Sequence, residues 1–334
     1  MNRDSDQKAP PPAGAPPSGK TNLLVAGALI AALAAGAIGL FRQGGNAKPQ
    51  LAKEAPLGEL SASAQALAPA EEDEPQTPEA LRQKMDALIR AGDQAISKRD
   101  IAAARKEYES ALAVAQRLAD HSPPSPPSTS ELAVLHIKLG DAAQVGSDMK
   151  AARGFYEKGV ELMKSAAEKE PKNTSAARDL AVTYNKLGHA THAGGDMKGA
   201  VELFEKSVEL TRGLAEADPK SSLFKQDLAL GQSTLGSLVE ATGDLKRARG
   251  LFEGSLKAYK SLLKADPKDT GAALGLASAH ARIAHLAARD GDKKAAKEHK
   301  KAALKALDEL EKGGLVKDNP GYENLKAYVK TLAD

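Results

Sequence analysis

The chain has 334 residues, of which 27% are charged and only 3% are aromatic, and its formal net charge at pH 7 is +3. So small a net charge gives no reason to expect a nucleic-acid partner. Cysteine is absent, which excludes disulfides, thiolate metal sites, cysteine catalysis and a lipid anchor on an N-terminal cysteine.

Residues 1–22 are polar and rich in proline, and we expect a disordered tail there. Residues 23–41 then form an unbroken run from Leu23 to Phe41 with no charged or polar side chain. As a helix this run would be about 28 Å long, close to the roughly 30 Å hydrocarbon core of a bilayer. The run therefore predicts one transmembrane helix.

The alternative for this run is a secretory signal peptide that is cleaved at the small residues around Ala37. The polar stretch before the run is long and weakly basic, and the run exceeds the usual length of about 7–15 residues. Both features favour the membrane anchor. Gly27, Ala31, Ala35 and Gly39 are spaced by four and form a ridge of small residues on the span. Such ridges let helices approach closely, so a weak homodimer through the span is a hypothesis.

Residues 42–76 are rich in alanine, proline and glutamate and include an acidic run from Glu71 to Glu74. This composition predicts a disordered linker in which the acidic run is a solvated spacer. Residues 77–334 form the remaining domain. We expect it to begin with a helix at Thr77 and Pro78, because a capping residue followed by proline is a typical helix start.

This domain repeats itself every 48 residues. Residues of different chemical types keep the same register, which is difficult to obtain by chance. A fixed period of this size is the signature of a solenoid. The markers are Asp100, Asp148, Asp196, Asp244 and Asp292; Pro123, Pro171, Pro219 and Pro267; and Leu132, Leu180, Leu228 and Leu276.

Each copy predicts two helices joined by a short turn. In the central copy Leu180, Tyr184 and Leu187 recur at helical spacing and form the packing stripe of the first helix. Gly188 follows, and because glycine inside a helix costs about 1 kcal/mol, we expect the partner helix to cross closely there. Asp196 is placed to cap the second helix, where its carboxylate accepts a hydrogen bond from an unpaired backbone N–H.

These residues resemble the tetratricopeptide repeat family. The resemblance implies an all-α fold: a right-handed superhelical solenoid of about five helix-turn-helix units with a closing helix near residues 322–333. The usual period is about 34 residues, so with 48 residues we expect both helices to be about two turns longer. The matching positions in the central copy are Tyr184, Leu187, Gly188, Thr191, Ala200, Phe204 and Ser207.

Long-spaced repeats of this kind resemble those often joined to bacterial signalling proteins, which implies a protein-binding role. Three lysines and arginines precede the predicted span and three follow it closely, so the positive-inside rule gives it no direction. A long segment after a first N-terminal span is commonly translocated. We therefore expect a single-pass protein of the bacterial inner membrane with its repeat domain in the periplasm.

The last copy departs from the pattern. Ile283 and Ala284 replace the Leu-Gly pair, and Lys300 stands where the other copies carry tyrosine or phenylalanine. We expect Lys300 to be exposed, because the end unit of a solenoid needs a polar outer side. The lysines between 293 and 305 are interpreted as a solvated face, and contact with an anionic partner or membrane is the alternative.

The histidines were considered as metal ligands. His189 and His192 are three residues apart, and His285 lies in the register of His189 two units later. This spacing matches no metal motif, and structural sites need four ligands, so we predict polar contacts and no metal. His136 and His280 share the register of Tyr184 and are expected to pack within their helix pairs. No nucleophile motif or phosphate loop appears, so we predict no catalytic residue and no cofactor.

The candidate binding surface is the concave groove that the family resemblance implies. It is formed by first helices and has mixed apolar, amide and imidazole character, so a peptide or partner helix could lie along it. The basic residues that chaperone-binding members of the family use are missing there. The candidate residues are Val134, Ile137, Asp141 and Gln144; Val182, Asn185, His189 and His192; and Leu230, Ser233, Ser237 and Glu240.

Together these features predict a membrane-anchored tetratricopeptide repeat scaffold that binds another protein or peptide and is not an enzyme. Two alternatives stay open. One is a structural spacer or self-assembly module, and the other is a non-catalytic subunit of a bacterial envelope or secretion complex. A long apolar concave surface favours the binder, whereas a groove lined only by lysine and glutamate would favour the spacer.

Overall fold

The computed structural model of the chain describes residues 77–121, 125–314, 316 and 319–332. The predicted tail, the predicted membrane span at 23–41 and the linker at 42–76 lie outside the described residues. Among the helices that are described, none is both long enough and apolar enough to cross a membrane.

The described part of the chain contains eleven helices and no strand. Most are 20 or 21 residues long, as the long repeat predicts. They are α2 (Pro78–Ser97), α3 (Ile101–Asp120), α4 (Pro126–Val145), α5 (Met149–Lys169), α6 (Thr174–Ala193), α7 (Met197–Ala217), α8 (Ser222–Ala241), α9 (Leu245–Ala265), α10 (Thr270–Arg289), α11 (Lys293–Lys312) and the shorter α12 (Pro320–Thr331).

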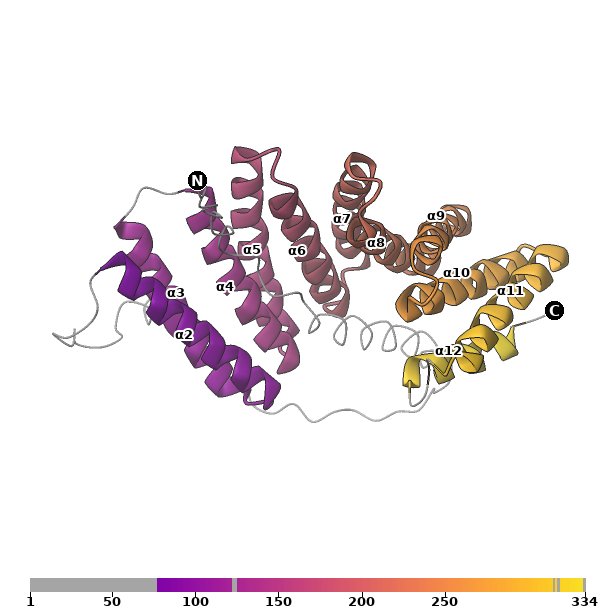
Figure 1. Cartoon of the computed structure of the whole chain (residues 1–334), viewed down its shortest axis with the longest axis horizontal. Helices are drawn as coiled ribbons and strands as arrows, with labels where there is room; N and C mark the ends of the chain where they lie inside the picture. Colours follow the sequence, from indigo (N-terminus) through magenta and orange to yellow (C-terminus); the bar gives the residue numbers. More distant parts are fainter. Residues whose placement is uncertain (1–76, 122–124, 315, 317–318, 333–334) are drawn as a thin grey trace, which may run out of the picture.

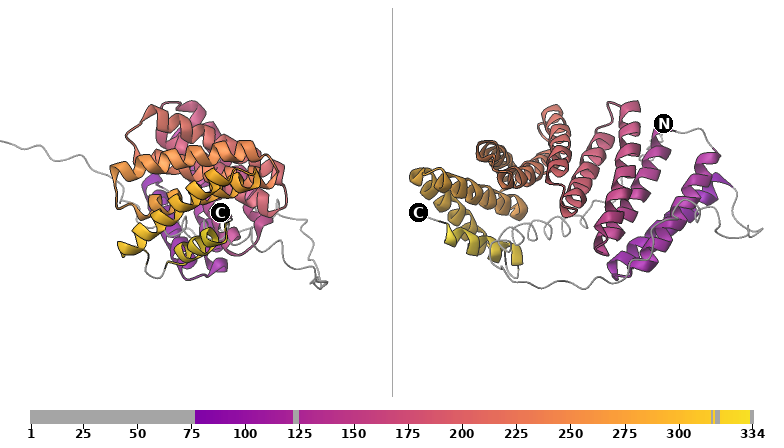
Figure 2. Two further views of the ribbon diagram at one scale, coloured as in Figure 1. Left: turned by 90° about the vertical axis from the view of Figure 1, so that its right-hand side faces the viewer. Right: turned by 180° about the vertical axis from the view of Figure 1, so that it is seen from behind.

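The helices form five antiparallel pairs that follow one another along an arc, and α12 closes the far end (Figure 1). Each second helix also packs on the first helix of the next pair, so the core is continuous from pair to pair. The first helices α8 and α10, with α12, lie on the inner side of the arc, and α7, α9 and α11 follow the outer side (Figure 1). The view from behind shows α2 and α12 at opposite ends (Figure 2, right).

The turns are set by side-chain caps. Thr77 caps α2 through a hydrogen bond from the backbone N–H of Ala80, which confirms the predicted helix start. An aspartate caps every second helix, and Asn173, Ser221 or Asp269 caps a later first helix. Each cap satisfies a backbone N–H that has no partner inside the helix. The aspartates are Asp100, Asp148, Asp196, Asp244 and Asp292.

A glycine and an aromatic ring hold each of the first four pairs together. At Gly188 a Cβ atom would lie 2.7 Å from the ring of Phe204, so the two helices cross at a distance that only glycine permits. Phe204 itself is 1% exposed. The prediction of a close crossing at Gly188 is confirmed. The same contact joins Gly92 to Tyr108, Gly140 to Tyr156 and Gly236 to Phe252.

The fifth pair replaces this contact, and here the prediction for Lys300 was wrong. Lys300 is partly buried, and its ammonium group donates a hydrogen bond to the carbonyl oxygen of Leu332 at 2.7 Å. The predicted closing helix is present as α12, and it returns over the last pair with Val329 fully buried. Because the chain supplies its own cover, the lysine serves as a partner for the end of α12.

Candidate functional site

The candidate residues all lie on the first helices α4, α6 and α8, as the sequence predicts. Their surroundings differ from unit to unit. In the first two units, acidic side chains join neighbouring pairs. The hydroxyl of Tyr108 donates to Asp93 at 2.6 Å, and the same carboxylate accepts a hydrogen bond from Lys138 of the next pair at 2.6 Å. Burial and the adjacent carboxylate raise the pKa of Tyr108, so it stays a hydrogen-bond donor.

Asp141 and Gln144 occupy the equivalent place in the second unit. The hydroxyl of Tyr156 donates to Asp141 at 2.7 Å and lies 2.8 Å from the side-chain oxygen of Gln144. Lys186 of α6 binds Asp141 at 2.6 Å, and its ammonium group lies 5.9 Å from the centre of the Tyr156 ring. Burial, with the charge of Asp141, raises the pKa of Tyr156. These two candidate residues therefore tie α4 to α5 and α6.

His189 takes the place of the aspartate in the third unit. Its ring meets Phe204 edge-on, with centroids 4.9 Å apart. Burial, then the nearby His192 and Lys186, lower the pKa of His189 to about 4, so the imidazole is neutral at pH 7. Besides the polar contacts predicted from the sequence, His189 therefore has a packing role, because its ring covers an aromatic side chain of its own helix pair.

Asn185 lies one turn before His189 and is half-buried. Its side-chain oxygen is buried and has no hydrogen-bond partner among the described residues. Leaving a buried carbonyl oxygen without a hydrogen bond costs about 1–3 kcal/mol of stability. A ligand that donates a hydrogen bond to this oxygen would remove that cost. Val182 and His192, on the same helix, are also half-buried.

The candidates on α8 divide into two kinds. Ser233 forms a hydroxyl–hydroxyl hydrogen bond of 2.8 Å with Ser255 of α9, and Ser237 donates to the backbone carbonyl of Ser233. Both serines are therefore used within their own helix pair. Leu230 is half-buried.

Glu240, also on α8, is 12% exposed at its side chain and faces two basic groups of α10. Its carboxylate lies 3.7 Å from Arg282 and 3.5 Å from His285. Burial lowers the pKa of His285 more than Glu240 raises it. Arg282 also lies over the ring of Tyr328, at 5.7 Å from the centroid, and so links α8, α10 and α12.

The two apolar candidates of α4 also separate. Val134 is 38% exposed, whereas Ile137 packs against α5 close to Gly159. Two of the candidates keep a buried side-chain oxygen without a hydrogen-bond partner among the described residues, and these are Asn185 and Glu240.

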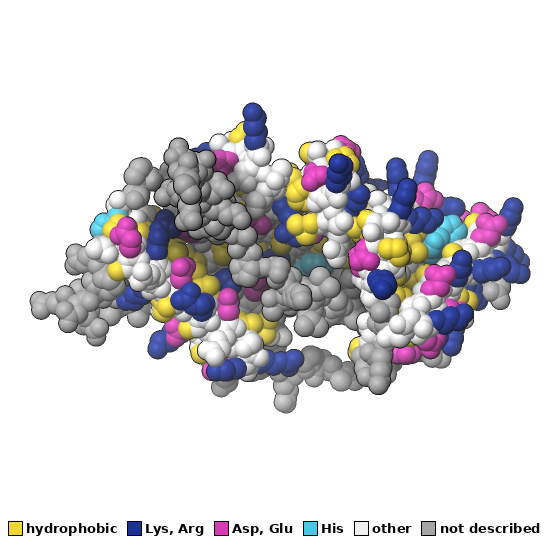
Figure 3. All heavy atoms as spheres, viewed as in Figure 1, with side chains coloured by type: hydrophobic (Ala, Val, Ile, Leu, Met, Phe, Trp, Pro, Cys, Tyr) yellow, Lys and Arg dark blue, Asp and Glu magenta, His cyan; other side chains and the backbone are white. Residues whose placement is uncertain are grey.

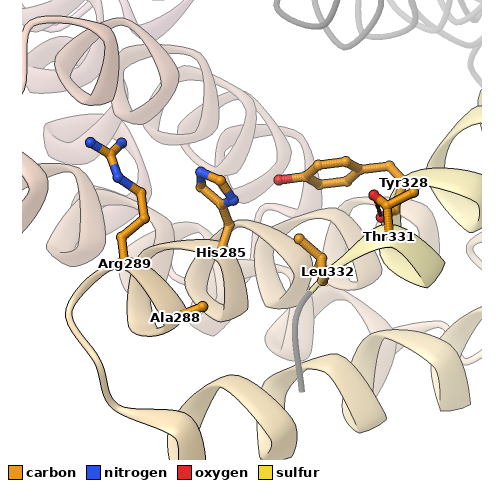
Figure 4. Close-up of a pocket in the computed structure, with 6 residues that line it drawn as sticks. All are labelled: His285, Ala288, Arg289, Tyr328, Thr331 and Leu332. Carbon is orange, nitrogen blue, oxygen red and sulfur yellow. Dashed lines mark hydrogen bonds between the residues drawn. The ribbon is translucent and has the colours of Figure 1, made fainter.

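Sequence reasoning missed a pocket of about 380 Å³ between α10 and α12 (Figure 4). Figure 4 shows the hydroxyl of Tyr328 pointing toward His285, and the side chain of Arg289 pointing away from α12. The pocket exists because α12 returns over α10, which no repeat pattern encodes. The repeated histidine register at 189 and 285 was the one available signal. Its lining residues are His285, Ala288, Arg289, Tyr328, Thr331 and Leu332.

The predicted packing roles of two other histidines are confirmed. His136 lies against Phe155, and His280 lies against His299 with 3.0 Å between their Nδ1 atoms. Within the described residues, no group of three or more histidines, aspartates or glutamates could hold a metal ion.

Residues 180–219 match a model of the tetratricopeptide repeat family. No curated protein matches the chain. Among solved structures, the apo form of RapI has a TM-score of 0.54 at 11% identity and covers 76% of this chain and 65% of its own. BtubC from P. vanneervenii has a TM-score of 0.47 at 14% identity, covering 70% of this chain and 92% of its own.

A further solved structure, a Podosopora anserina kinesin light chain with TPR-like repeats, has a TM-score of 0.46 at 17% identity and covers 69% of this chain and 96% of its own. Identities this low concern the fold alone. The match supports the tetratricopeptide repeat family for residues 180–219, which lie inside an all-helical solenoid.

Proposed function

We propose that the protein is a membrane-anchored, non-catalytic, right-handed superhelical scaffold that binds a segment of another protein across α6 and α8. The observation that carries this proposal is the buried side-chain oxygen of Asn185, which has no partner among the described residues. An amide offers both a donor and an acceptor, so it suits the alternating donors and acceptors of a peptide backbone.

One of the polar contacts that join earlier units is missing at the same location, although Arg178 of α6 still binds Asp227 of α8. Acid–lysine pairs join α2 to α4 and α4 to α6 through Asp93–Lys138 and Asp141–Lys186. The equivalent positions between α6 and α8 are His189 and Thr234, which cannot form an ion pair at pH 7. The acid–lysine contact is therefore absent here, and the side-chain oxygen of Asn185 on the same helix has no partner among the described residues. Nearby Val182 and Leu230 add apolar contact, as ligand sites usually require.

A binding titration tests this function. The partner is first retrieved with full-length protein in detergent, and its affinity is then measured for wild type and for the Asn185→Ala/His192→Ala variant. We expect at least about a tenfold loss, or 1.4 kcal/mol, with an unchanged circular dichroism spectrum. His189 is left intact because it packs on Phe204. The control is Lys198→Ala on α7, whose side chain is 90% exposed. Equal affinities for all three proteins would move the site elsewhere.

The anchor is proposed from residues 23–41, and the repeat domain is proposed to lie in the periplasm. Full-length protein should stay with membranes after washing at high salt or alkaline pH. A soluble product with a new N-terminus near Ala37 would instead identify a cleaved signal peptide. Protease treatment of spheroplasts shows on which side of the inner membrane the repeat domain lies, because a periplasmic domain would be degraded without lysis.

A further inference from the structure

The outer face of α9 and α11 carries a concentration of positive charge. Residues 245–312 contain 16 lysines and arginines against 9 acidic residues, whereas residues 77–244 contain 22 against 24. Figure 3 shows basic side chains gathered over this end of the molecule. We define the outer basic surface as eight exposed lysines: Lys246, Lys257, Lys260 and Lys264 of α9, and Lys293, Lys294, Lys297 and Lys301 of α11.

These lysines form none of the ion pairs that the earlier units show, although Glu253 and Glu298 lie one turn from Lys257 and Lys294. On α5, Lys164 pairs with Glu168 and Lys158 pairs with Glu161. Two units later, the position of Glu168 is occupied by a lysine, and so is the position of Glu161. Among the described residues, none of the eight lysines has an acidic group within ion-pair distance. The substitutions at 257 and 264 thus convert a neutralised face into a cationic one.

Charges of α9 also act on α11, and both helices pack against α10. Burial lowers the pKa of His299 on α11, and Arg249 and Lys260 of α9 lower it further, so positive charges of α9 act on a side chain of α11. An excess of like charge destabilises a folded protein unless an anion compensates it.

The shape and composition of the outer basic surface indicate which class of anionic partner it fits. The two aromatic residues of α9, Phe252 and Tyr259, are 1% and 3% exposed, so no ring is available for the base stacking that single-stranded nucleic acids need. The lysines are spread along two helices on the outside of an arc, and the pocket described above lies elsewhere, between α10 and α12. Such a layout suits an extended anionic plane better than one small anion.

We propose that the outer basic surface lies against anionic phospholipid headgroups of the membrane to which the chain is tethered. This inference rests on the proposed anchor at residues 23–41, because the tether keeps the solenoid near a bilayer. Each lysine near an anionic surface contributes roughly a fivefold gain in partitioning. The tether adds a high effective concentration, so several weak contacts suffice. The docked solenoid would direct its inner face, with Asn185, away from the lipid.

Lysine footprinting on the full-length protein tests this docking. The protein is inserted into liposomes of phosphatidylcholine alone or with about 30% phosphatidylglycerol, acetylated with an amine reagent, and analysed by mass spectrometry. In anionic liposomes we expect Lys257, Lys260 and Lys264 to react at least about threefold more slowly than in neutral ones. Lys158 and Lys164 of α5 are the matched internal controls and should not change. Salt at about 0.5 M should abolish the difference, because the Debye length falls below about 5 Å.

Two variants sharpen the test. Lys257→Glu/Lys264→Glu restores the residue type that α5 and α7 carry at the same positions, so the fold should be retained, and the remaining lysines should lose protection. Glu161→Lys/Glu168→Lys should give α5 a protection that it lacks. Equally fast labelling of Lys257, Lys260 and Lys264 in both liposomes would overturn the proposal. Equally slow labelling in both liposomes would also overturn it and would indicate cover by a second copy of the chain.

Failure of the anchor has a separate signature, which is recovery of the protein outside both kinds of liposome. In that case the same protein is mixed with preformed vesicles. Sedimentation with anionic vesicles that is lost in Lys257→Glu/Lys264→Glu would support the lipid-binding surface without the anchor. No sedimentation with either vesicle would overturn the surface as well.

Discussion

The second and fifth helix pairs place different chemistry on the same repeat positions. In the second pair Gly140 admits the ring of Tyr156, whose hydroxyl binds Asp141. In the fifth pair Ala284 and Lys300 stand at the glycine and tyrosine positions, and the lysine binds the end of α12. A pair in the array interior has a neighbour on each side, whereas the last pair must generate its own cover. One backbone unit therefore supports a ring packed on glycine or a charged cap, depending on what lies next to it.

The surface charge of the second helices also differs between the two ends of the array. On α5, i,i+4 ion pairs such as Arg153–Glu157 neutralise the exposed face. On α9 and α11 lysines replace several of the acidic partners. Exposed pairs contribute little to stability, about 0.3–0.5 kcal/mol each, so the repeat can change the charge of its surface without losing its fold. This freedom lets one end of the array acquire a surface function.

The largest expected effect comes from filling the close crossing. Gly188→Leu should lower the free energy of unfolding by up to about 3 kcal/mol, because the new side chain would enter the space of the Phe204 ring. Gly213→Leu on α7 is the control, since a Cβ there meets nothing within 4 Å. That change should be neutral or stabilising by up to about 1 kcal/mol. Urea titration of both variants would contradict the crossing if their midpoints shifted alike.

A smaller loss of stability is expected when the pH is lowered, through a histidine of the fifth helix pair. Burial, then the adjacent His299 and Lys260, lower the pKa of His280 from 6.5 to about 4. The unfolded chain therefore binds the proton first, and the stabilisation that is complete above about pH 6.5 is lost as the pH falls toward 4. Because solvent screens part of the interaction, we expect a loss of about 1–2 kcal/mol.

Thermal melting of wild type and His280→Gln between pH 7 and pH 4 measures this loss. Glutamine is the residue at the equivalent position of the fourth pair, Gln232. The variant should show a shallower decline of Tm with acidification. An identical decline in both proteins would place the titrating group elsewhere, with His189 as the next candidate because its pKa is also lowered to about 4.

Transferring the Asp–Tyr pair of the second unit to the third unit tests whether the two residues stabilise the fold only when both are present. Tyr156→Phe should cost about 1 kcal/mol through the lost hydroxyl contact with Asp141. In the third unit, His189→Asp and Phe204→Tyr should each destabilise alone. Combined, they recreate the Asp–Tyr pair and should recover about 1 kcal/mol relative to the sum of the single changes. A double-mutant cycle with no coupling would show that the pair depends on other parts of the second unit.

The smallest effect concerns the end of the array. Lys300→Ala should cost about 0.5–1 kcal/mol through the lost hydrogen bond to Leu332, and the loss should appear first as faster hydrogen exchange in α12. The adjacent Lys301 is exposed, and Lys301→Ala should stay within about 0.5 kcal/mol. Equal exchange rates in α12 for both variants would mean that Lys300 does not hold the closing helix.

The sequence by itself determined the helices and their limits. Cap residues such as Asp196 and Asn173 act within three residues of their own positions, so their effect is local and readable from the chain. A close helix crossing at Gly188 was predictable because a glycine recurs at the same position in neighbouring copies, whereas its contact with Phe204 comes from the structure. The first helices that carry the candidate site were predictable for the same reason.

Only the tertiary structure decided which side chains on those helices are already used. His189 packs on Phe204, Ser233 binds Ser255, and the oxygen of Asn185 is left without a partner among the described residues. These outcomes depend on separations of a few ångströms between helices, and periodicity fixes the face of a helix without fixing such distances. The return of α12, which buries part of Lys300 and closes the pocket beside His285, likewise depends on packing between segments that no repeat relates.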